Sequence, residues 1–280
     1  MDINLSLVLY NILWMLPLGI AVGLFGTLIG AGGGFILVPI LLLVYPHKSP
    51  ETITSISLAV VFFNSFSGSC TYSKMKRIDY KAGLLFSCTV IPGAIFGAIS
   101  VNYIPRNAFD LIFGIILVAI SMFLIFKPEL KGDRKVKSHG INMLRNITDA
   151  DGINYIFSFN PIVGLVIGLI VGFLSSLLGI GGGIIHVPAL VHFLDYPVHL
   201  ATATSHFMLA IMSFSGSMVH LFQGALNHDW LDGIILGVGV IIGAPVGARL
   251  SNKLNGKWII RSLAIALALV GIRILFTVRW

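Results

Sequence analysis

Charged side chains are scarce in this chain. Asp, Glu, Lys and Arg make up only 10% of the 280 residues, whereas hydrophobic residues make up 56% and the mean hydropathy is +0.96. So few charges cannot cover a surface that is in contact with water. The composition excludes a soluble globular domain and predicts an integral protein whose main partner is the lipid bilayer.

Acidic residues and catalytic motifs are missing from the interior of the apolar runs. The aspartates next to these runs all lie at their predicted ends: Asp79, Asp110, Asp195, Asp229 and Asp232. A carboxylate proton relay of the kind found in pumps is therefore absent. The chain also lacks an HExxH motif, a GxSG motif and a Walker-type GxxxxGK loop. We expect neither intramembrane hydrolysis nor ATP-driven pumping, and we expect no catalytic residue and no cofactor.

Metal ligands are also poorly represented. The two cysteines, Cys70 and Cys88, lie inside predicted spans without metal-ligand spacing. No carboxylate or thiolate joins the histidines at a chelating spacing, so we expect no metal site. The net charge of +7 resides in loops, where it sets membrane topology, and nucleic acid is not an expected partner.

Eight apolar runs are long enough to cross a bilayer, which takes about 20 helical residues. They lie near 7–29, 52–73, 82–104 and 108–126, and again near 161–178, 201–223, 231–248 and 259–278. A shorter run follows the first member of each set, at 34–45 and 183–194. Because about 12 residues form only roughly 18 Å of helix, each short run is predicted to stop inside the membrane or to tilt against an unwound loop.

One ten-residue phrase occurs twice, 149 positions apart. Gly30–Pro39 reads GAGGGFILVP and Gly179–Pro188 reads GIGGGIIHVP. The similarity continues along both halves, for example between Ser65–Gly68 and Ser213–Gly216. This duplication predicts two copies of one membrane unit, residues 1–126 and 160–280, joined by a basic linker at 127–159.

The loop charges predict that the two copies have opposite orientations. The loop 74–81 carries four basic residues and its counterpart 224–231 carries none, whereas the next loop is basic in the second half only. Basic loops are retained in the cytoplasm, so equivalent loops face opposite sides and each copy crosses the membrane an odd number of times. The predicted fold is an all-α polytopic membrane protein with two inverted-topology repeats of about five helical segments each, in which the short helices are broken at the GxGGG motifs.

The same charges predict the sidedness of the chain. The linker 127–159 contains six basic residues and falls on the side of the other basic loops, which makes that side cytoplasmic and places both termini outside. The expected location is the bacterial inner membrane. The linker itself is expected to be solvated, with an interfacial amphipathic turn near Ile141 to Ile147.

The glycine triplets are the first candidate substrate site. Glycine lets the backbone approach a ligand, and a helix that begins after such a loop offers unpaired N–H groups and the positive end of its dipole to an anion. The candidate residues are Gly32, Gly33 and Gly34 before the short run 35–45, and Gly181, Gly182 and Gly183 before 184–194. The alternative is that these glycines only permit close helix packing.

A polar stripe supplies the remaining candidates. At 100° per residue, one face of the helix that starts near 199 carries His199, Thr202, His206, Ser213, Ser217 and His220. Lipid would not tolerate this face, so it is predicted to point into the bundle. We expect Ser57, Asn64, Ser205 and His206 to line the substrate cavity, with His206 and His220 as candidates for proton coupling. The alternative is that these side chains form hydrogen bonds between helices or pack as uncharged core residues.

At these motifs the sequence resembles the sulfite exporter TauE/SafE family of membrane permeases. The resemblance is carried by the two GxGGGxxxVP phrases and by the segment Ala203-Thr204-Ser205, which continues to Ser213, Gly216, His220 and Gly224. It covers essentially the whole chain apart from 127–159. In the first half, Ser55-Ile56-Ser57 replaces Ala-Thr-Ser and Tyr72 stands at the position of His220, so equal contact of both half-sites with a substrate does not follow.

The resemblance implies secondary or facilitative transport of small sulfur oxyanions and organosulfonates, such as sulfite or sulfoacetate. We expect an alternating-access exporter that holds this small anionic substrate at the membrane midplane between the two glycine loops. An anion channel, an uptake permease for another small organic anion, an intramembrane enzyme and a receptor subunit remain alternatives. Whether the chain forms a homo-oligomer is left open.

Overall fold

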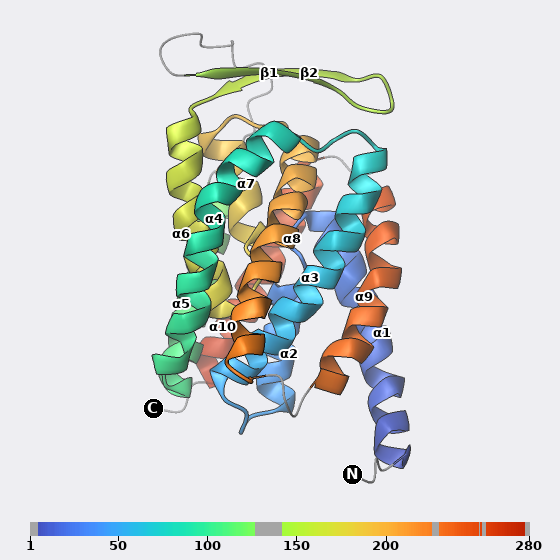
Figure 1. Cartoon of the computed structure of the whole chain (residues 1–280), viewed down its shortest axis with the longest axis vertical. Coiled ribbons are helices and arrows are strands. Elements are labelled where there is room, and N and C mark those ends of the chain that lie inside the picture. The colour runs from blue at the N-terminus through green and yellow to red at the C-terminus, as the bar shows by residue number, and fades with distance from the viewer. Residues whose placement is uncertain (1–4, 127–141, 226–229, 252, 254–255, 278–280) are drawn as a thin grey trace.

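The computed structural model describes residues 5–126, 142–225, 230–251, 253 and 256–277, and within them ten α-helices form one bundle with a small β-hairpin at one end (Figure 1). The helices of the first half are α1 (Leu5–Ile29), α2 (Gly34–Val44), α3 (Pro50–Lys74), α4 (Tyr80–Ser100) and α5 (Arg106–Phe126), with a short 3-10 helix η1 (Val101–Tyr103) between α4 and α5. Strands β1 (Met143–Thr148) and β2 (Asn154–Phe159) follow. The helices of the second half are α6 (Pro161–Leu178), α7 (Gly183–Phe193), α8 (Val198–Phe222), α9 (Trp230–Ser251) and α10 (Gly256–Thr277).

The predicted all-α membrane fold is confirmed. Seven of the described helices are long and apolar enough to cross a membrane, and α2 and α7 have only 11 residues each. The chain is therefore an integral, multi-pass membrane protein. The five helices on each side of the hairpin follow the order of the apolar runs in the sequence.

Helix starts follow the local sequence. Ser49 caps α3 by accepting a hydrogen bond from the N–H of Thr52, and Pro50 occupies the first turn. Asn160 caps α6 in the same way and is followed by Pro161. An oxygen side chain satisfies one of the N–H groups that a helix start leaves free, and proline at the first helical position removes another.

The linker prediction needs a correction, because residues 143–148 form strand β1 and not an amphipathic turn. β1 pairs with β2 in an antiparallel hairpin, and the rest of the predicted linker, 127–141, lies outside the described residues. The strands contain β-branched and aromatic residues, which favour this geometry. Asp149 opens the turn by accepting hydrogen bonds from the N–H groups of Asp151 and Ile153, and Gly152 takes a positive φ of 81°.

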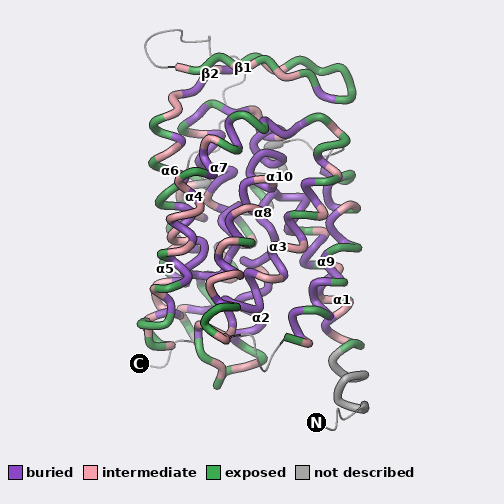
Figure 2. The backbone as a smooth tube through the Cα atoms, in the orientation of Figure 1, coloured by how far each residue is buried: buried purple, intermediate pink, exposed green. Residues whose placement is uncertain are grey.

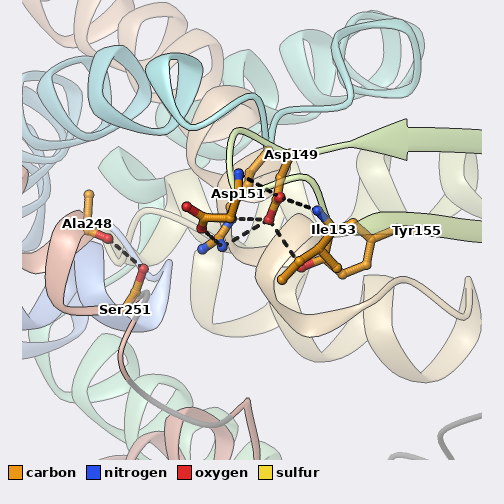
Figure 3. A network of polar contacts seen from close by, with 7 residues as sticks. Asp149, Asp151, Ile153, Tyr155, Ala248 and Ser251 are labelled. Carbon is orange, nitrogen blue, oxygen red and sulfur yellow. Dashed lines mark hydrogen bonds and ion pairs between the residues drawn. The ribbon is translucent and has the colours of Figure 1, made fainter.

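Two groups of ionic contacts attach the hairpin to the helix bundle. Arg145 on β1 binds the buried carboxylate of Asp79, with its Nε 2.7 Å from Oδ2, and this contact raises the pKa of Arg145. Arg77, just after α3, donates to Asp149 from Nη2 at 3.0 Å and from Nε at 3.2 Å. Figure 3 shows Asp149 at the centre of the second group, between Asp151, Ile153 and Tyr155. The hairpin is thus joined to the turn between α3 and α4.

The two halves of the chain share one core. Gly19 and Gly23 of α1 pack against the backbone of α9 near Leu236 and Val240, and Gly172 of α6 packs against the backbone of α4 near Val90. Small residues allow helices to approach closely in a bilayer. The first helix of each half therefore packs against the fourth helix of the other half.

The predicted polar stripe points into the bundle, as expected. On α8, the side chains of Thr202, His206, Ser213, Ser217 and His220 are all buried, whereas His199 at its start is partly exposed. α3 carries a comparable buried set, and Figure 2 shows many buried residues along both helices.

Candidate functional site

Each of the two glycine phrases forms a short loop between the first and second helices of its half. Gly30, Gly32 and Gly33 have φ values of 81°, 76° and 81°, and Gly179, Gly181 and Gly182 have values of 68°, 77° and 67°. Side chains other than glycine rarely adopt this conformation. Gly33 and Gly182 are the N-cap residues of α2 and α7, and neither helix start receives a side-chain cap. The triplets therefore end at Gly34 and Gly183, the first residues of the two short helices.

The two loops touch each other in the buried centre of the protein. A Cβ atom placed on Gly34 would lie 2.6 Å from the carbonyl oxygen of Gly179 and 2.7 Å from the carbonyl carbon of Ile180. A Cβ atom on Gly183 would lie 2.1 Å from the carbonyl oxygen of Gly30 and 2.5 Å from the Cα atom of Ala31. Each short helix thus begins against the loop of the other half, at equivalent positions of the repeated phrase.

Two apolar side chains cover both loops. Val61 of α3 and Leu209 of α8 are fully buried. A Cβ atom on Gly32 would lie 2.4 Å from Leu209 Cδ2 and 3.1 Å from Val61 Cγ1, and one on Gly181 would meet the same two side chains. The space next to Gly32 and Gly181 is therefore filled by hydrocarbon side chains.

The hydroxyl groups of Ser57 and Ser205 hold the loops. Ser57 Oγ donates to the carbonyl oxygen of Gly179 at 2.6 Å, and Ser205 Oγ donates to that of Gly30 at 3.4 Å. Both serines are fully buried, and each binds the loop of the other half. In this conformation both hydroxyl protons form hydrogen bonds within the protein. Contact of Ser57 and Ser205 with a substrate stays a prediction.

Asn64 and His206 meet through Thr27, a residue near the end of α1. The hydroxyl of Thr27 donates to Asn64 Oδ1 at 2.9 Å, and His206 Nε2 lies 3.2 Å from the same hydroxyl oxygen. Because the hydroxyl proton is directed to Asn64, Nε2 of His206 is assigned as the donor. The hydroxyl of Tyr72 lies 2.8 Å from the carbonyl oxygen of Thr27, and its ring stands edge-on to His206 at 5.7 Å. These four residues form a polar cluster beside the first glycine loop.

Asn64 also faces the loop itself. A Cβ atom on Gly26 would lie 3.0 Å from Asn64 Nδ2 and 2.4 Å from the backbone nitrogen of Gly33. Among the described residues, Asn64 Nδ2 has no hydrogen-bond partner although it is fully buried. An unpaired buried amide donor is costly unless something accepts its proton. This donor next to the N-cap of α2 is the feature of the centre that best fits an anion.

The second half does not repeat this cluster. The positions of Thr27, Asn64, Tyr72 and His206 correspond to Ser176, Met212, His220 and Leu58 in the other half. Ser176 Oγ and both ring nitrogens of His220 have no hydrogen-bond partner among the described residues. The central polar cluster is thus one-sided, although the loops around it are symmetric.

A scan against protein families matches residues 15–274 to the family described as sulfite exporter TauE/SafE. The chain belongs to this family. It is 33% identical to the probable membrane transporter protein YunE of Bacillus subtilis over 268 residues, which cover 94% of this chain and 96% of the relative. It is 28% identical to the probable membrane transporter protein MJ0441 of Methanocaldococcus jannaschii over 279 residues, which cover 94% and 96% of the two chains. No solved structure gives a significant match to the chain.

The TauE/SafE match and the names of the relatives indicate a membrane transporter, not an enzyme. The resemblance to the TauE/SafE family that the sequence showed is therefore confirmed. The substrate and the direction of transport are not decided by these comparisons.

In this TauE/SafE protein the structure brings most of the predicted site residues together at the centre. The six glycines of the triplets, Ser57, Asn64, Ser205 and His206 lie in or against the two loops. His220 is buried near the far end of α8, at the position of Tyr72 in the repeat. The described residues hold no group of three or more His, Cys, Asp or Glu side chains that could bind a metal ion.

Sequence reasoning missed Thr27, Val61 and Leu209. Thr27 was overlooked because one hydroxyl in a long apolar run is most often bonded to its own helix. A signal was present, since the second half also has a hydroxyl residue, Ser176, three positions before its loop begins.

Proposed function

We propose that this TauE/SafE family member is a secondary transporter of small sulfur-containing anions, such as sulfite or organosulfonates like sulfoacetate, and that it works as an exporter. The observation that carries the proposal is the meeting of two uncapped helix starts in the buried centre, beside the unpaired amide of Asn64. Helix N-termini attract negative charge through their free N–H groups and their dipoles. A tetrahedral oxyanion suits several N–H donors that converge on one point.

The proposed mechanism is alternating access between two inverted repeats. The exchange of helix contacts between the halves supports it, because α1 packs on α9 and α4 packs on α6. In this proposal, one half rocks against the other around the glycine loops and exposes the site to each side in turn. Val61 and Leu209 would have to move aside to admit the anion, since they fill the space over both loops.

His206 and His220 are the proposed proton carriers of this mechanism. Both are buried on α8, and no acidic side chain lies in the middle of a span to do this work. His206 Nε2 already donates to Thr27, which in turn binds Asn64, so protonation at Nδ1 would leave these hydrogen bonds in place and add a positive charge beside the first glycine loop. Facilitated exchange without a proton is the alternative within the same proposal.

The test is counterflow in proteoliposomes that contain the purified protein. Vesicles loaded with unlabelled sulfite or sulfoacetate should accumulate the labelled anion in a saturable manner, and an imposed pH gradient should change the extent of accumulation. An ohmic anion current without saturable exchange would instead support the channel. Absence of flux for every sulfur anion, together with flux of a carboxylate, would refute the substrate class.

The variant Asn64→Leu tests the site within this assay. It removes the unpaired donor and should lower exchange about tenfold or more, because one hydrogen bond to a charged group is worth about 1.5–3 kcal/mol. Met212→Leu is the matched control, since Met212 occupies the same repeat position without a polar group, and it should transport normally. Equal activity of both variants would remove Asn64 from the site.

A further inference from the structure

A groove of about 620 Å3 runs along the outside of the bundle between α3, α4 and α8. Its lining is mainly aromatic and aliphatic, with Phe62 and Phe66 from α3 and Phe207 and Phe214 from α8. Phe66 and Phe214 are 58% and 47% exposed, so the groove is open along its length. Because the chain spans a membrane, this open side faces hydrocarbon.

The length of the groove corresponds to one leaflet of a bilayer. Its lining on α3 extends from Phe62 to Ser73, which is about 16 Å of helix at 1.5 Å per residue. The hydrocarbon core of a bilayer is about 30 Å thick, so one leaflet contributes about 15 Å. The groove ends at Ile78, in the turn between α3 and α4 to which the hairpin is attached, and at Tyr80, the first residue of α4.

Three lysines are adjacent in the sequence to residues at this end of the groove. Lys74 follows Ser73 of the lining, Lys81 follows Tyr80, and Lys76 lies in the turn between them, and all three side chains are exposed. The nearby carboxylates are already engaged, since Asp79 binds Arg145 and Asp149 binds Arg77. Among the residues described in the structure, the three lysines form no ion pair, so their positive charge is available to a ligand.

Among the described polar residues that line the groove, Ser69 has an unpaired buried hydroxyl. Ser69 is 9% exposed and lines the groove one helical turn, or about 6 Å, deeper than Ser73. Its hydroxyl has no hydrogen-bond partner among the described residues. A donor at this depth, below a cluster of lysines, matches the ester carbonyl that joins an acyl chain to a phosphate headgroup.

We propose that this groove is a binding site for one anionic phospholipid. An acyl chain lies along Phe66 and Phe214, the hydroxyl of Ser69 donates to the ester carbonyl, and the phosphate end of the lipid faces Lys74, Lys76 and Lys81. Lysines near a membrane surface select lipids with net negative charge, because a zwitterionic headgroup offers no net attraction. The site is separate from the glycine loops, and the inference does not depend on which anion is transported.

The two native cysteines provide the test. Cys70 lines the groove, whereas Cys88 on α4 is not part of its lining, and both are exposed thiols. Delipidated protein in detergent is treated with monobromobimane in the presence of phosphatidylglycerol or phosphatidylcholine, and labelling of each cysteine is followed by peptide mass spectrometry. Phosphatidylglycerol should slow labelling of Cys70 while labelling of Cys88 continues at the same rate.

Two sets of variants check the two ends of the lipid. Lys74→Gln together with Lys81→Gln should weaken protection by phosphatidylglycerol about fivefold for each lysine removed. Ala210→Leu adds volume inside the groove and should also weaken protection, whereas Ala119→Leu on the exposed face of α5 should not.

Equal protection of Cys70 by phosphatidylcholine would overturn the anionic selectivity on which the proposal rests. Protection that appears without added lipid and increases with protein concentration would also overturn it, because a second copy of the chain would then cover the groove. Unchanged protection in the double lysine variant would show that the lysines do not hold the headgroup.

Discussion

At the scale of single residues, the centre depends on positions where no side chain fits. Gly34 and Gly183 have ordinary helical conformations, so their requirement for glycine comes from contact and not from backbone strain. The nearest atoms are backbone atoms of the opposite loop, which cannot rotate away as a side chain could. The loops can meet only if both positions stay without a Cβ atom.

Gly183→Ala should therefore lower the melting temperature of the purified protein by roughly 5–10 °C, since overpacking commonly costs about 1–3 kcal/mol and here meets rigid backbone. Gly233→Ala is the control, because Gly233 lies in the first turn of α9 and, among the described residues, no atom outside its own helix backbone comes within 4 Å of an added Cβ. It should be neutral or slightly stabilising, as alanine favours a helix over glycine. Thermal unfolding in detergent measures both, and equal melting temperatures would show that the loops are not in close contact.

At the scale of elements, ion pairs join the hairpin to the helix bundle. Asp149 is buried with Arg77, and burial alone would raise the pKa of its carboxyl. The hydrogen bond from the N–H of Ile153, the hydrogen bond from Arg77 and the charge of Arg77 outweigh this, so the pKa of Asp149 is lowered from its ordinary value of 3.8. Folding therefore stabilises the ionised carboxylate of Asp149 relative to the unfolded chain.

A lowered pKa gives a defined dependence on pH. The stabilisation from Asp149 is present above the ordinary pKa of 3.8 and is lost as the pH falls through the lower pKa of the folded state. Asp149→Asn should lower the melting temperature at neutral pH by a few degrees and should reduce the loss of stability as the pH falls below 3.8.

Asp151→Asn is the matched control for this measurement. Asp151 contacts the same guanidinium at 3.3 Å, but its side chain is 57% exposed, and exposed ion pairs contribute little. Its melting profile should follow that of the wild type. If both variants gave the same acid profile, burial of Asp149 would not be the reason for its contribution.

At the scale of the whole molecule, the distribution of charge predicts how the bundle sits in the membrane. The hairpin end carries Lys74, Lys76, Lys81 and Arg145, and α4 leads from this end to Asn102 at the other end of the bundle. Because basic segments are retained in the cytoplasm, we expect the hairpin inside the cell.

Single-cysteine variants can check this orientation once Cys70 and Cys88 are replaced by serine. Thr148→Cys on the hairpin and Asn102→Cys beyond α4 both place a thiol at an exposed position. An impermeant maleimide added to intact cells should label Asn102→Cys and should label Thr148→Cys only after the membrane is opened. The opposite pattern would reverse the sidedness, and labelling of both in intact cells would mean that α4 does not separate them across the bilayer.

Much of the architecture was predictable because a bilayer imposes simple rules on sequence. The apolar runs located ten helices, including the two short ones at 34–45 and 183–194, since helix length in a membrane follows hydrocarbon thickness. The hairpin was not predicted as such, because the six basic residues of the stretch 127–159 suggested a solvated linker. Its ionic contacts to the bundle are made with Asp79 and Arg77, which lie more than 60 residues away in the chain.

The sequence by itself determined that the chain is a membrane protein, that its two halves have similar sequences and that a glycine loop precedes each short helix. These properties follow from composition, spacing and the absence of a Cβ atom. Only the tertiary structure decided that the loops touch, that Ser57 and Ser205 bind loop carbonyls, and that Thr27 joins Asn64 to His206. The reason is that a hydrogen bond between helices depends on their rotation and depth, and packing of the whole bundle sets both.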